Sequence, residues 1–400
     1  MGMTKSNVSI VYVLNTPDFF LSHRLPIALQ AQSVGFDIHV VTAGDSNRCK
    51  EVQTICSYGF THHTVGFSRS GVNPVRELIC ILTLYKLFRT LSPNIVHLVT
   101  IKPVLYGGLA AKLSKVSSVV AAVSGLGSVF SSHTFKTAIL RIFVIFLYKA
   151  ALSHKSLAVI FQNYDDLEVL CSSKVLERAN AVIINGSGVD LNEYTCIEEP
   201  VSEPPIVVMA ARLLLEKGVL EFIEAGEILK KRGIAVDMRL IGAPDYGNPN
   251  SVDEVLLRQF EESSFVKLLG FRDDVGYQYS QANIVCLPSY YGEGLPKCLV
   301  EAAACGRAVI TTDHPGCRDA IVPDETGILV PVKDPVALAD AIQKLIEDID
   351  LRQSMGRNGR ILAQESFAIE KIVEQHMQIY KSCVLEGTKA QKVGICNEPY

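Results

Sequence analysis

Several features that would assign this chain to a special class are missing from its 400 residues. No run of about 18 uninterrupted apolar residues occurs, so no membrane-spanning helix is expected. The N-terminus has no long apolar region and no A-x-A site, so we expect no secretory signal peptide. A formal net charge of −4 gives no argument for bulk binding of nucleic acid.

The eleven cysteines lack the spacing of a metal site or a disulfide framework. Their number is odd, no C-x-x-C pair occurs, and Cys286, Cys298 and Cys305 lie in apolar runs. Free cysteines behave as small buried hydrophobic residues, and reduced thiols are typical of cytosolic proteins. We therefore expect a cytosolic chain whose cysteines are reduced.

The chain does have the apolar content of a well-packed globular protein, at 48% hydrophobic and 20% charged residues. Its length is too great for one core of ordinary size and predicts two domains.

Short apolar runs alternate with amphipathic helical patterns through the first half of the chain. Because these runs are continuous rather than alternating, both faces of the sheet should be covered. Strand–helix–strand repetition predicts an α/β fold with a doubly wound parallel sheet. The expected strands are 8–14, 37–43, 95–100, 119–124, 157–162 and 181–186.

The polar segment 186–205, with three prolines and no periodicity, interrupts this pattern and is interpreted as a linker. The alternation then resumes and predicts a second doubly wound domain. Its expected strands are 205–212, 236–242, 265–270, 283–288, 307–312 and 326–330. The predicted division is a first domain 1–186, a linker 187–205, a second domain 206–365, a helix 366–385 returning to the first domain, and a loose tail 386–400.

Loops at the carboxyl ends of parallel strands are the usual ligand sites of such sheets, and two such domains should face each other across a cleft. The loop after the first strand of the second domain carries Arg212 and Lys217, followed by Gly218 and a helix. A forked guanidinium and a lysine beside a helix N-terminus suit a diphosphate. The alternative is a solvated pair of surface cations.

The stretch GEGLPKCLVEAAACGR, 292–307, places Glu293 in a glycine-rich turn and Glu301 in an apolar helix. The helix should open at Leu295, Pro296 and Lys297, with free N–H groups that can bind a phosphate.

Eight helical residues separate the two carboxylates by up to about 12 Å, more than the ~5–9.5 Å of a glycosidase pair. The spacing favours two ends of one extended ligand, with a ribose diol on Glu301, sugar hydroxyls on Glu293 and phosphates between them. The alternative is a pair of solvated surface carboxylates.

The segment 135–155 combines basic residues at 136, 141, 149 and 155 with many aliphatic and aromatic ones. Two interpretations carry equal weight. One is a helix buried between the sheet and its neighbours. The other is a basic helix lying on an anionic bilayer surface.

Four motifs of the second half, in this order along the chain, resemble the retaining glycosyltransferases of family 4, which have the GT-B fold. The motifs are NGSGVD (185–190), Arg212-x4-Lys217-Gly218, GFRDDV (270–275) and Glu293-x7-Glu301. The resemblance spans roughly 8–380 and is strongest over 205–345.

The first half is similar to a bacterial branch of that family which extends lipid-linked surface sugars. The stretches that carry this similarity are FFLSHRLPIAL (19–29), TIKPVLYGGLAAKL (100–113), SGLGSVF (124–130) and IFQNYDDL (160–167).

The resemblance implies a role for each matching residue. Arg212, Lys217 and Glu293 would form the catalytic set: the two cations would neutralise the donor diphosphate, and Glu293 would position the donor sugar. The implied donor-binding residues are Phe271, Arg272, Gly294, Leu295, Pro296, Lys297, Leu299, Val300 and Glu301.

On the acceptor side, the resemblance implies loops of the first domain. The residues concerned are Asn15, Asp18, Ser22, His23, Arg24, Lys102, Ser124 and Gly125. Many family members carry a histidine after the fourth strand of this domain, where this chain has 124–127, SGLG. A catalytic role for that histidine therefore does not transfer to this chain. His97 is interpreted as a strand residue.

The implied activity is metal-independent hexosyl transfer with retention, and no cofactor. A hexose or N-acetylhexosamine would move from a nucleotide sugar, expected to be a UDP-sugar, to a polyprenyl-diphosphate-linked saccharide in surface polysaccharide, O-antigen or lipopolysaccharide synthesis. The D-x-D at 348–350 is interpreted as a solvated helix cap rather than a metal site.

We expect a cytoplasmic protein, peripheral on the inner face of the cytoplasmic membrane through helix 135–155. Two other functions stay open. A nucleotide-sugar epimerase can have the same architecture, and a non-catalytic protein could bind sugar nucleotides without turnover.

Overall fold

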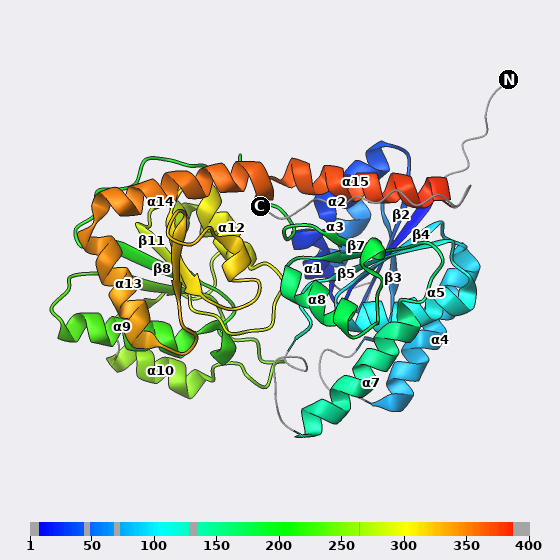
Figure 1. The fold of residues 1–400 in the computed structure, drawn as a ribbon, viewed down its shortest axis with the longest axis horizontal. Coiled ribbons are helices and arrows are strands. Elements are labelled where there is room, and N and C mark those ends of the chain that lie inside the picture. The colour runs from blue at the N-terminus through cyan, green and yellow to red at the C-terminus, as the bar shows by residue number, and fades with distance from the viewer. Residues whose placement is uncertain (1–7, 44–48, 68–72, 128–134, 264, 387–400) are drawn as a thin grey trace. The chain divides into compact units, whose positions relative to one another are not determined.

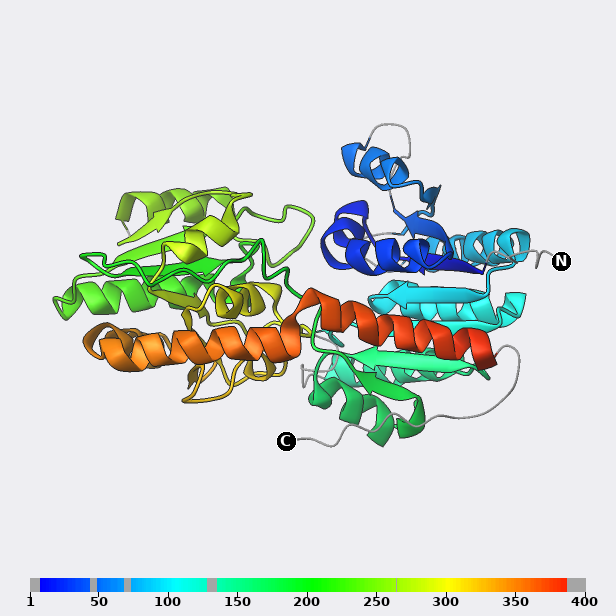
Figure 2. The ribbon, with the colours of Figure 1, turned by 90° about the horizontal axis from the view of Figure 1, so that it is seen from above.

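The computed structural model describes residues 8–43, 49–67, 73–127, 135–263 and 265–386. The chain forms two compact units, shown as a ribbon in Figures 1 and 2. The N-terminal unit comprises Met1–Ser187 and Glu370–Tyr400, and the C-terminal unit comprises Gly188–Ile369.

The N-terminal unit is built on a seven-stranded sheet in the order β3-β2-β1-β4-β5-β6-β7, and every strand pair is parallel. Its strands are β1 (Ser9–Val13), β2 (Asp37–Thr42), β3 (Thr61–Thr64), β4 (Ile95–Val99), β5 (Ser118–Val123), β6 (Leu157–Phe161) and β7 (Ala181–Ile183). Its helices are α1 (Pro17–His23), α2 (Leu25–Ser33), α3 (Lys50–Ser57), α4 (Pro74–Leu91), η1 (Pro103–Gly107), α5 (Gly108–Ser114), α7 (Phe135–Ala151), α8 (Tyr164–Ser172), η2 (Arg178–Asn180) and most of α15 (Ile369–Glu386).

Helices cover both faces of this sheet, because successive residues of each strand point to opposite sides. In β1, Val11 and Val13 join a core with residues of α4, η1, α5, α7 and α8. Ile10 and Tyr12 join the opposite core, with residues of α1, α2, α3 and α15.

The C-terminal unit has a six-stranded parallel sheet in the order β10-β9-β8-β11-β12-β13. Its strands are β8 (Ile206–Ala210), β9 (Asp237–Ile241), β10 (Val266–Leu268), β11 (Ile284–Leu287), β12 (Ala308–Thr312) and β13 (Gly327–Val330). Its helices are η3 (Leu215–Lys217), α9 (Val219–Lys231), α10 (Glu254–Ser263), α11 (Val275–Ser280), α12 (Lys297–Ala304), η4 (Arg318–Ala320), α13 (Pro335–Glu347), α14 (Ile349–Leu362) and η5 (Ala363–Phe367). The predicted pair of doubly wound parallel domains is therefore confirmed.

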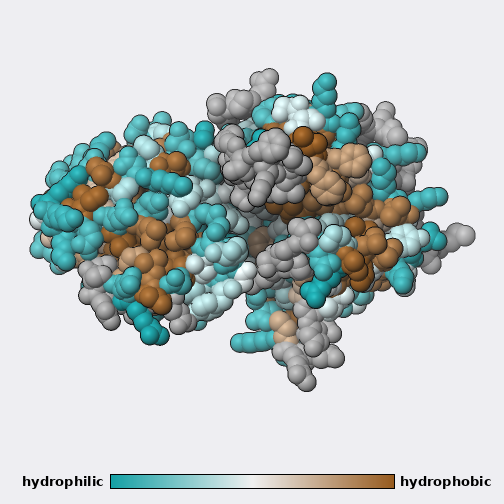
Figure 3. All heavy atoms as spheres, turned by 90° about the horizontal axis from the view of Figure 1, so that it is seen from below, coloured by the Kyte–Doolittle hydropathy of each residue, from teal (hydrophilic) through white to brown (hydrophobic). Residues whose placement is uncertain are grey.

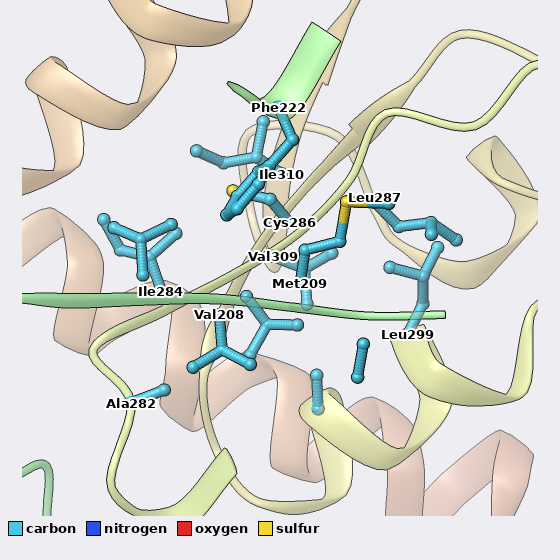
Figure 4. Close-up of a cluster of buried hydrophobic side chains, with 14 of the residues drawn as sticks. Val208, Met209, Phe222, Ala282, Ile284, Cys286, Leu287, Leu299, Val309 and Ile310 are labelled. Carbon is cyan, nitrogen blue, oxygen red and sulfur yellow. The ribbon is translucent and has the colours of Figure 1, made fainter. Parts of the chain in front are cut away.

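The core of this unit is formed by the continuous apolar runs of its strands. Figure 4 shows Val208 and Met209 of β8 among side chains of β11, β12, α9 and α12. These strands anchor the loops that follow them, and the candidate site lies on those loops.

The segment predicted as a linker, 187–205, is part of the C-terminal unit from Gly188 onward, which corrects the prediction. Its polar residues have partners there. Ser202 donates to Asn283 at 2.5 Å, and Arg352 contacts Glu199 at 2.6 Å. The polar composition therefore reflects hydrogen bonding to the second unit rather than a free connection.

The C-terminal end of the chain belongs to the first unit. Helix α15 places Ile372, Met377 and Tyr380 in the N-terminal core. The predicted loose tail begins at 386, where α15 ends, and 387–400 lie outside the described residues.

Asp348 of the D-x-D is the N-cap of α14, and its side chain accepts a hydrogen bond from the Leu351 N–H. The interpretation as a helix cap is confirmed. Across the described ranges, no group of three or more His, Cys, Asp or Glu could hold a metal ion. Within the same ranges, no helix has the length and apolar character needed to cross a bilayer.

Candidate functional site

The strand order of the C-terminal unit reverses between β8 and β11, which are hydrogen-bonded neighbours. The loops that leave the carboxyl ends of such a pair diverge to opposite sides of the sheet and create a ligand crevice. Here these loops are 211–218 and 288–296, the two segments that carry Lys217 and Glu293.

Gly218 allows the two loops to approach closely. Its φ of +82° lies in the left-handed region, and a Cβ at this position would lie 2.2 Å from the carbonyl oxygen of Pro288. The approach brings Lys217 Nζ to 2.5 Å from Glu293 Oε2. Ser289 donates to the other carboxylate oxygen of Glu293 at 3.1 Å. An ion pair between a buried lysine and a partly buried glutamate therefore lies at the topological switch point.

Lys217 keeps its positive charge in this place. Burial alone would lower the pKa of its ammonium, but the adjacent Glu293 carboxylate raises it above its ordinary value. The same ammonium lies 5.5 Å from the centre of the Tyr291 ring. A buried cation with one carboxylate partner is suited to take a phosphate as a second, competing partner.

Helix α12 begins at Lys297, with Pro296 as its N-cap and no side-chain cap. The prediction that Leu295 and Pro296 open the helix is corrected, because both lie in the preceding turn. Gly316, from the loop after β12, packs against that turn, and a Cβ there would lie 1.7 Å from the Gly294 carbonyl oxygen. Residues 293–296 are thus held between two other loops of the unit.

Glu301 is a buried carboxylate on α12, only 7% exposed. The hydroxyl of Tyr194 donates to its Oε1 at 2.8 Å, and Lys297 Nζ lies 3.3 Å from the same oxygen. Burial raises the pKa of this carboxyl, while Lys297 and Tyr194 lower it. Two donors therefore hold the glutamate in its apolar helix.

Tyr194 was not predicted as a site residue, because its segment was interpreted as a linker. The available signal was an aromatic residue in that otherwise polar stretch.

Arg212 follows β8 as predicted, but it is half exposed and pairs with Asp245 at 2.8 Å. Asp245 lies in the loop after β9 and was also missed. The backbone ties these two loops together, because the Leu213 N–H donates to the Ala243 carbonyl. Arg212 is therefore held beside the crevice by Asp245, whereas Lys217 is joined directly to Glu293.

Phe271 and Arg272, which were predicted to bind the donor, lie after β10. Phe271 is 78% exposed, and the guanidinium of Arg272 forms two hydrogen bonds with the Asp274 carboxylate, of 2.7 and 2.6 Å. Leu299 and Val300 do not line an open surface, which corrects the prediction for both. Both are buried in the core. Figure 4 shows Leu299 of α12 among the side chains of the sheet.

In the N-terminal unit the strand order reverses between β1 and β4. Asn15 follows β1, and Ser124 and Gly125 follow β5, next to β4. Thr100, after β4, has a φ of +74°, which is rare for a β-branched residue and was not predicted. Asn15 Oδ1, Thr100 Oγ1 and Ser124 Oγ are buried without a protein hydrogen-bond partner. Strained backbone and unpartnered polar atoms are common at ligand sites.

Arg24 was predicted to face the acceptor, and the structure corrects this. As the residue between α1 and α2, it is only 1% exposed, and its Nη1 donates to the His23 carbonyl at 2.9 Å. His97 is a buried residue of β4, as predicted, and bonds to the Tyr380 hydroxyl.

The other predicted acceptor residues have local contacts. Asp18 and Ser22 are exposed on α1, and His23 stacks on Phe19 at a ring distance of 4.0 Å. Lys102 Nζ lies 2.9 Å from the Glu77 carboxylate.

Two family models match the chain and together span most of its length. The model described as glycosyl transferases group 1 matches residues 193–362, and the glycosyl transferase 4-like model matches residues 9–163. The division between them agrees with the boundary between the two compact units.

Curated relatives match the chain along almost its full length. An N,N'-diacetylbacillosaminyl-diphospho-undecaprenol alpha-1,3-N-acetylgalactosaminyltransferase of Campylobacter jejuni is 28% identical over 383 residues, 90% of this chain and 97% of the relative. A UDP-Gal:alpha-D-GlcNAc-diphosphoundecaprenol alpha-1,3-galactosyltransferase of Escherichia coli is 22% identical over 408 residues, 96% of this chain and all of the relative.

Among solved structures, Anabaena Alr3699/HepE in complex with UDP-glucose has a TM-score of 0.75 at 18% identity and covers 94% of this chain and 100% of its own. That likeness concerns the fold, whereas the family models concern the sequence itself. The N-terminal unit matches the glycosyl transferase 4-like model, and the C-terminal unit matches the glycosyl transferases group 1 model. The chain therefore belongs to the family 4 glycosyltransferases with the GT-B fold.

Proposed function

We propose that this glycosyltransferase moves a hexose or N-acetylhexosamine, with retention, from a UDP-sugar to a polyprenyl-diphosphate-linked saccharide during surface polysaccharide synthesis. The observation that carries the proposal is the largely buried Lys217–Glu293 pair at the switch point of the C-terminal unit, next to the N-terminus of α12. The relatives named above support the acceptor class, and the two whose names include UDP-Gal or UDP-glucose support the nucleotide.

In this proposal the donor diphosphate replaces Glu293 as the partner of Lys217. The freed Glu293 carboxylate then accepts hydrogen bonds from hydroxyls of the donor sugar. Arg212, at the edge of the crevice, exchanges Asp245 for a phosphate oxygen, and Glu301 receives the ribose hydroxyls. Ion pairs of the free protein thus keep the charged groups in position until the donor binds.

Bond cleavage sends the electron pair of the bond between the sugar carbon and the phosphate oxygen to the departing diphosphate. Lys217 and the uncapped N–H groups of α12 stabilise that developing charge. The acceptor hydroxyl bonds to the same carbon from the same face, and its proton passes to the departing oxygen. Lys217 and the N–H groups of α12 supply the stabilisation of the departing diphosphate that a metal ion supplies in other enzymes. We therefore propose a metal-independent reaction without a cofactor.

On the acceptor side, the proposal uses the unpartnered polar atoms of Asn15, Thr100 and Ser124, which can bond to saccharide hydroxyls. The lipid moiety requires contact with a membrane. We assign that contact to the basic segment 135–155, on the inner face of the cytoplasmic membrane.

The catalytic assignment predicts that Lys217→Ala lowers kcat for sugar transfer by roughly 10²–10³, because one well-placed donor to the developing charge is lost. The assay measures labelled sugar transferred from UDP-sugars to a polyprenyl-diphosphate saccharide. Lys344→Ala, which alters an exposed lysine of the same unit, serves as the control. Full transfer by folded Lys217→Ala protein would disprove the assignment.

The same assay separates the other two functions. An epimerase would interconvert UDP-sugars without an acceptor. A binding protein would be stabilised by UDP in a thermal-shift screen of nucleoside diphosphates and would turn over none of the lipid acceptors. Retention is tested by the anomeric configuration of the product in NMR spectra.

A further inference from the structure

Helix α4 carries apolar residues on two opposite faces. Cys80, Leu84 and Phe88 point into the core of the N-terminal unit. On the other side lie Val75, Leu78, Ile79 and Leu82, whose exposed fractions run from 47% to 67%. Their spacing of i, i+3, i+4 and i+7 forms one stripe along the helix. A helix that only covers a sheet requires one apolar face, so the outward stripe has another purpose.

Helix α7 repeats this arrangement. Tyr148 and Ala151 are buried, while Ile142, Phe143 and Phe146 are between 57% and 70% exposed. Both helices pack on η1 and α5, so they belong to the same side of the unit. In Figure 1 they lie near each other, and Figure 3, seen from below, shows brown hydrophobic residues gathered over this unit. Exposed apolar clusters of this kind mark interaction surfaces.

The exposed charges of the two helices are of one sign. Lys86 and Arg89 continue the apolar stripe of α4 and are exposed, and Lys149 does the same on α7. The single acidic residue in the sequences of both helices, Glu77, is buried and paired with Lys102 at 2.9 Å. Apolar side chains flanked by basic ones match the boundary between the headgroups and acyl chains of an anionic bilayer.

We infer that α4 and α7 form a two-helix membrane-binding face, in which the outward stripe of α4 inserts into the surface of an anionic bilayer. The inference deepens the proposed function and rests on it for the lipid-linked acceptor. It adds α4, which lies outside the segment 135–155, to the membrane contact. It also predicts that apolar side chains insert into the bilayer, in addition to the electrostatic attraction between basic side chains and anionic lipids. A soluble protein partner is the less favoured occupant, because acidic residues are absent from the exposed surface of both helices.

The test is co-sedimentation of the full-length protein with vesicles of phosphatidylcholine alone or mixed with phosphatidylglycerol. The wild type should bind the mixed vesicles. The double variant Ile79→Ser/Leu82→Ser should bind them at least roughly tenfold more weakly, since each large aliphatic side chain withdrawn from water contributes about a decade in affinity. Lys86→Glu/Arg89→Glu should lose the preference for phosphatidylglycerol. Val34→Ser, an equally exposed apolar residue at the end of α2, should bind as the wild type does.

Circular dichroism and thermal unfolding establish that each variant is folded. Undiminished vesicle binding by the folded α4 double variant would overturn the inference. Size-exclusion chromatography tests whether a second copy of the chain occupies this face instead. A wild-type dimer that the α4 substitutions dissociate, together with no binding to vesicles, would also overturn the inference.

Transfer to a short-chain, water-soluble acceptor keeps the two proposals apart. The α4 variants should retain transfer to this acceptor and lose transfer to the vesicle-embedded one. If the wild type binds vesicles but transfers no sugar to either acceptor, the proposed function fails while the membrane face stands.

Discussion

At the scale of single residues, the site depends on two glycines, which have no side chain to keep neighbouring loops apart. Gly218 brings Lys217 to Glu293, and Gly316 packs on the turn that holds Glu293. At both positions φ lies in the left-handed region, near +83°, and a Cβ would collide with a carbonyl oxygen. Chemistry at this site therefore depends on close backbone approach as much as on charged groups.

Gly218→Ala and Gly233→Ala separate the cost of the backbone angle from the cost of the close approach. Gly233 also has a positive φ, +71°, but a Cβ there would meet nothing within 4 Å. We expect Gly233→Ala to cost about 1 kcal/mol of unfolding free energy and to leave UDP affinity unchanged. Gly218→Ala should cost more and weaken UDP binding by about tenfold or more, because loop 211–218 must move away from Pro288.

Urea unfolding and calorimetric titration with UDP measure these effects. Equal effects of the two substitutions would show that the contact with Pro288 does not position Lys217.

At the scale of elements, α15 is held on the N-terminal unit by a buried polar cluster. The Tyr380 hydroxyl lies 2.6 Å from His97 Nδ1 and 3.0 Å from the Tyr12 hydroxyl. Burial lowers the pKa of His376 to about 3 and that of His97 well below its ordinary value, and the Arg24 charge adds to both shifts. Both rings are therefore neutral in the folded protein at neutral pH.

This cluster predicts acid-sensitive docking of α15. The unfolded chain takes up protons on these histidines below about pH 6.5, whereas in the folded chain His376 stays neutral until the pH approaches 3 and the pKa of His97 also lies well below its ordinary value. Stability should therefore fall as the pH drops through this window, by about 1.4 kcal/mol per pH unit for each histidine.

His376→Gln should remove one histidine's share of that slope, and Gln378→Ala, on the exposed face of the same helix, should leave the slope intact. Urea unfolding at a series of pH values measures it. An identical slope in wild type and His376→Gln would refute the assignment.

At the scale of the whole molecule, two units with separate cores share one chain. The donor residues Lys217, Glu293 and Glu301 all lie in the C-terminal unit. A ligand stabilises the unit that binds it, by an amount that grows with its concentration relative to Kd.

Scanning calorimetry of the intact protein should therefore show two transitions, of which UDP raises one. Lys217→Ala should reduce that shift and leave the other transition in place. A UDP-induced shift of both transitions by the same amount would contradict donor binding by the C-terminal unit alone.

The sequence by itself determined the fold class, because continuous apolar strands alternating with amphipathic helices require a parallel sheet with both faces buried. It also placed Arg212, Lys217 and Glu293 on loops after strands and Glu301 on the helix that follows, since their neighbours in the chain mark the strand ends.

Only the tertiary structure decided which groups meet. Tyr194 reaches Glu301 across 107 positions, and no local pattern records such a contact. The same holds for Arg212, which pairs with Asp245 from a neighbouring loop, and for Arg24, which is buried between two helices. Local periodicity reflects the burial of a side chain within its own element, whereas its partner depends on how distant elements pack.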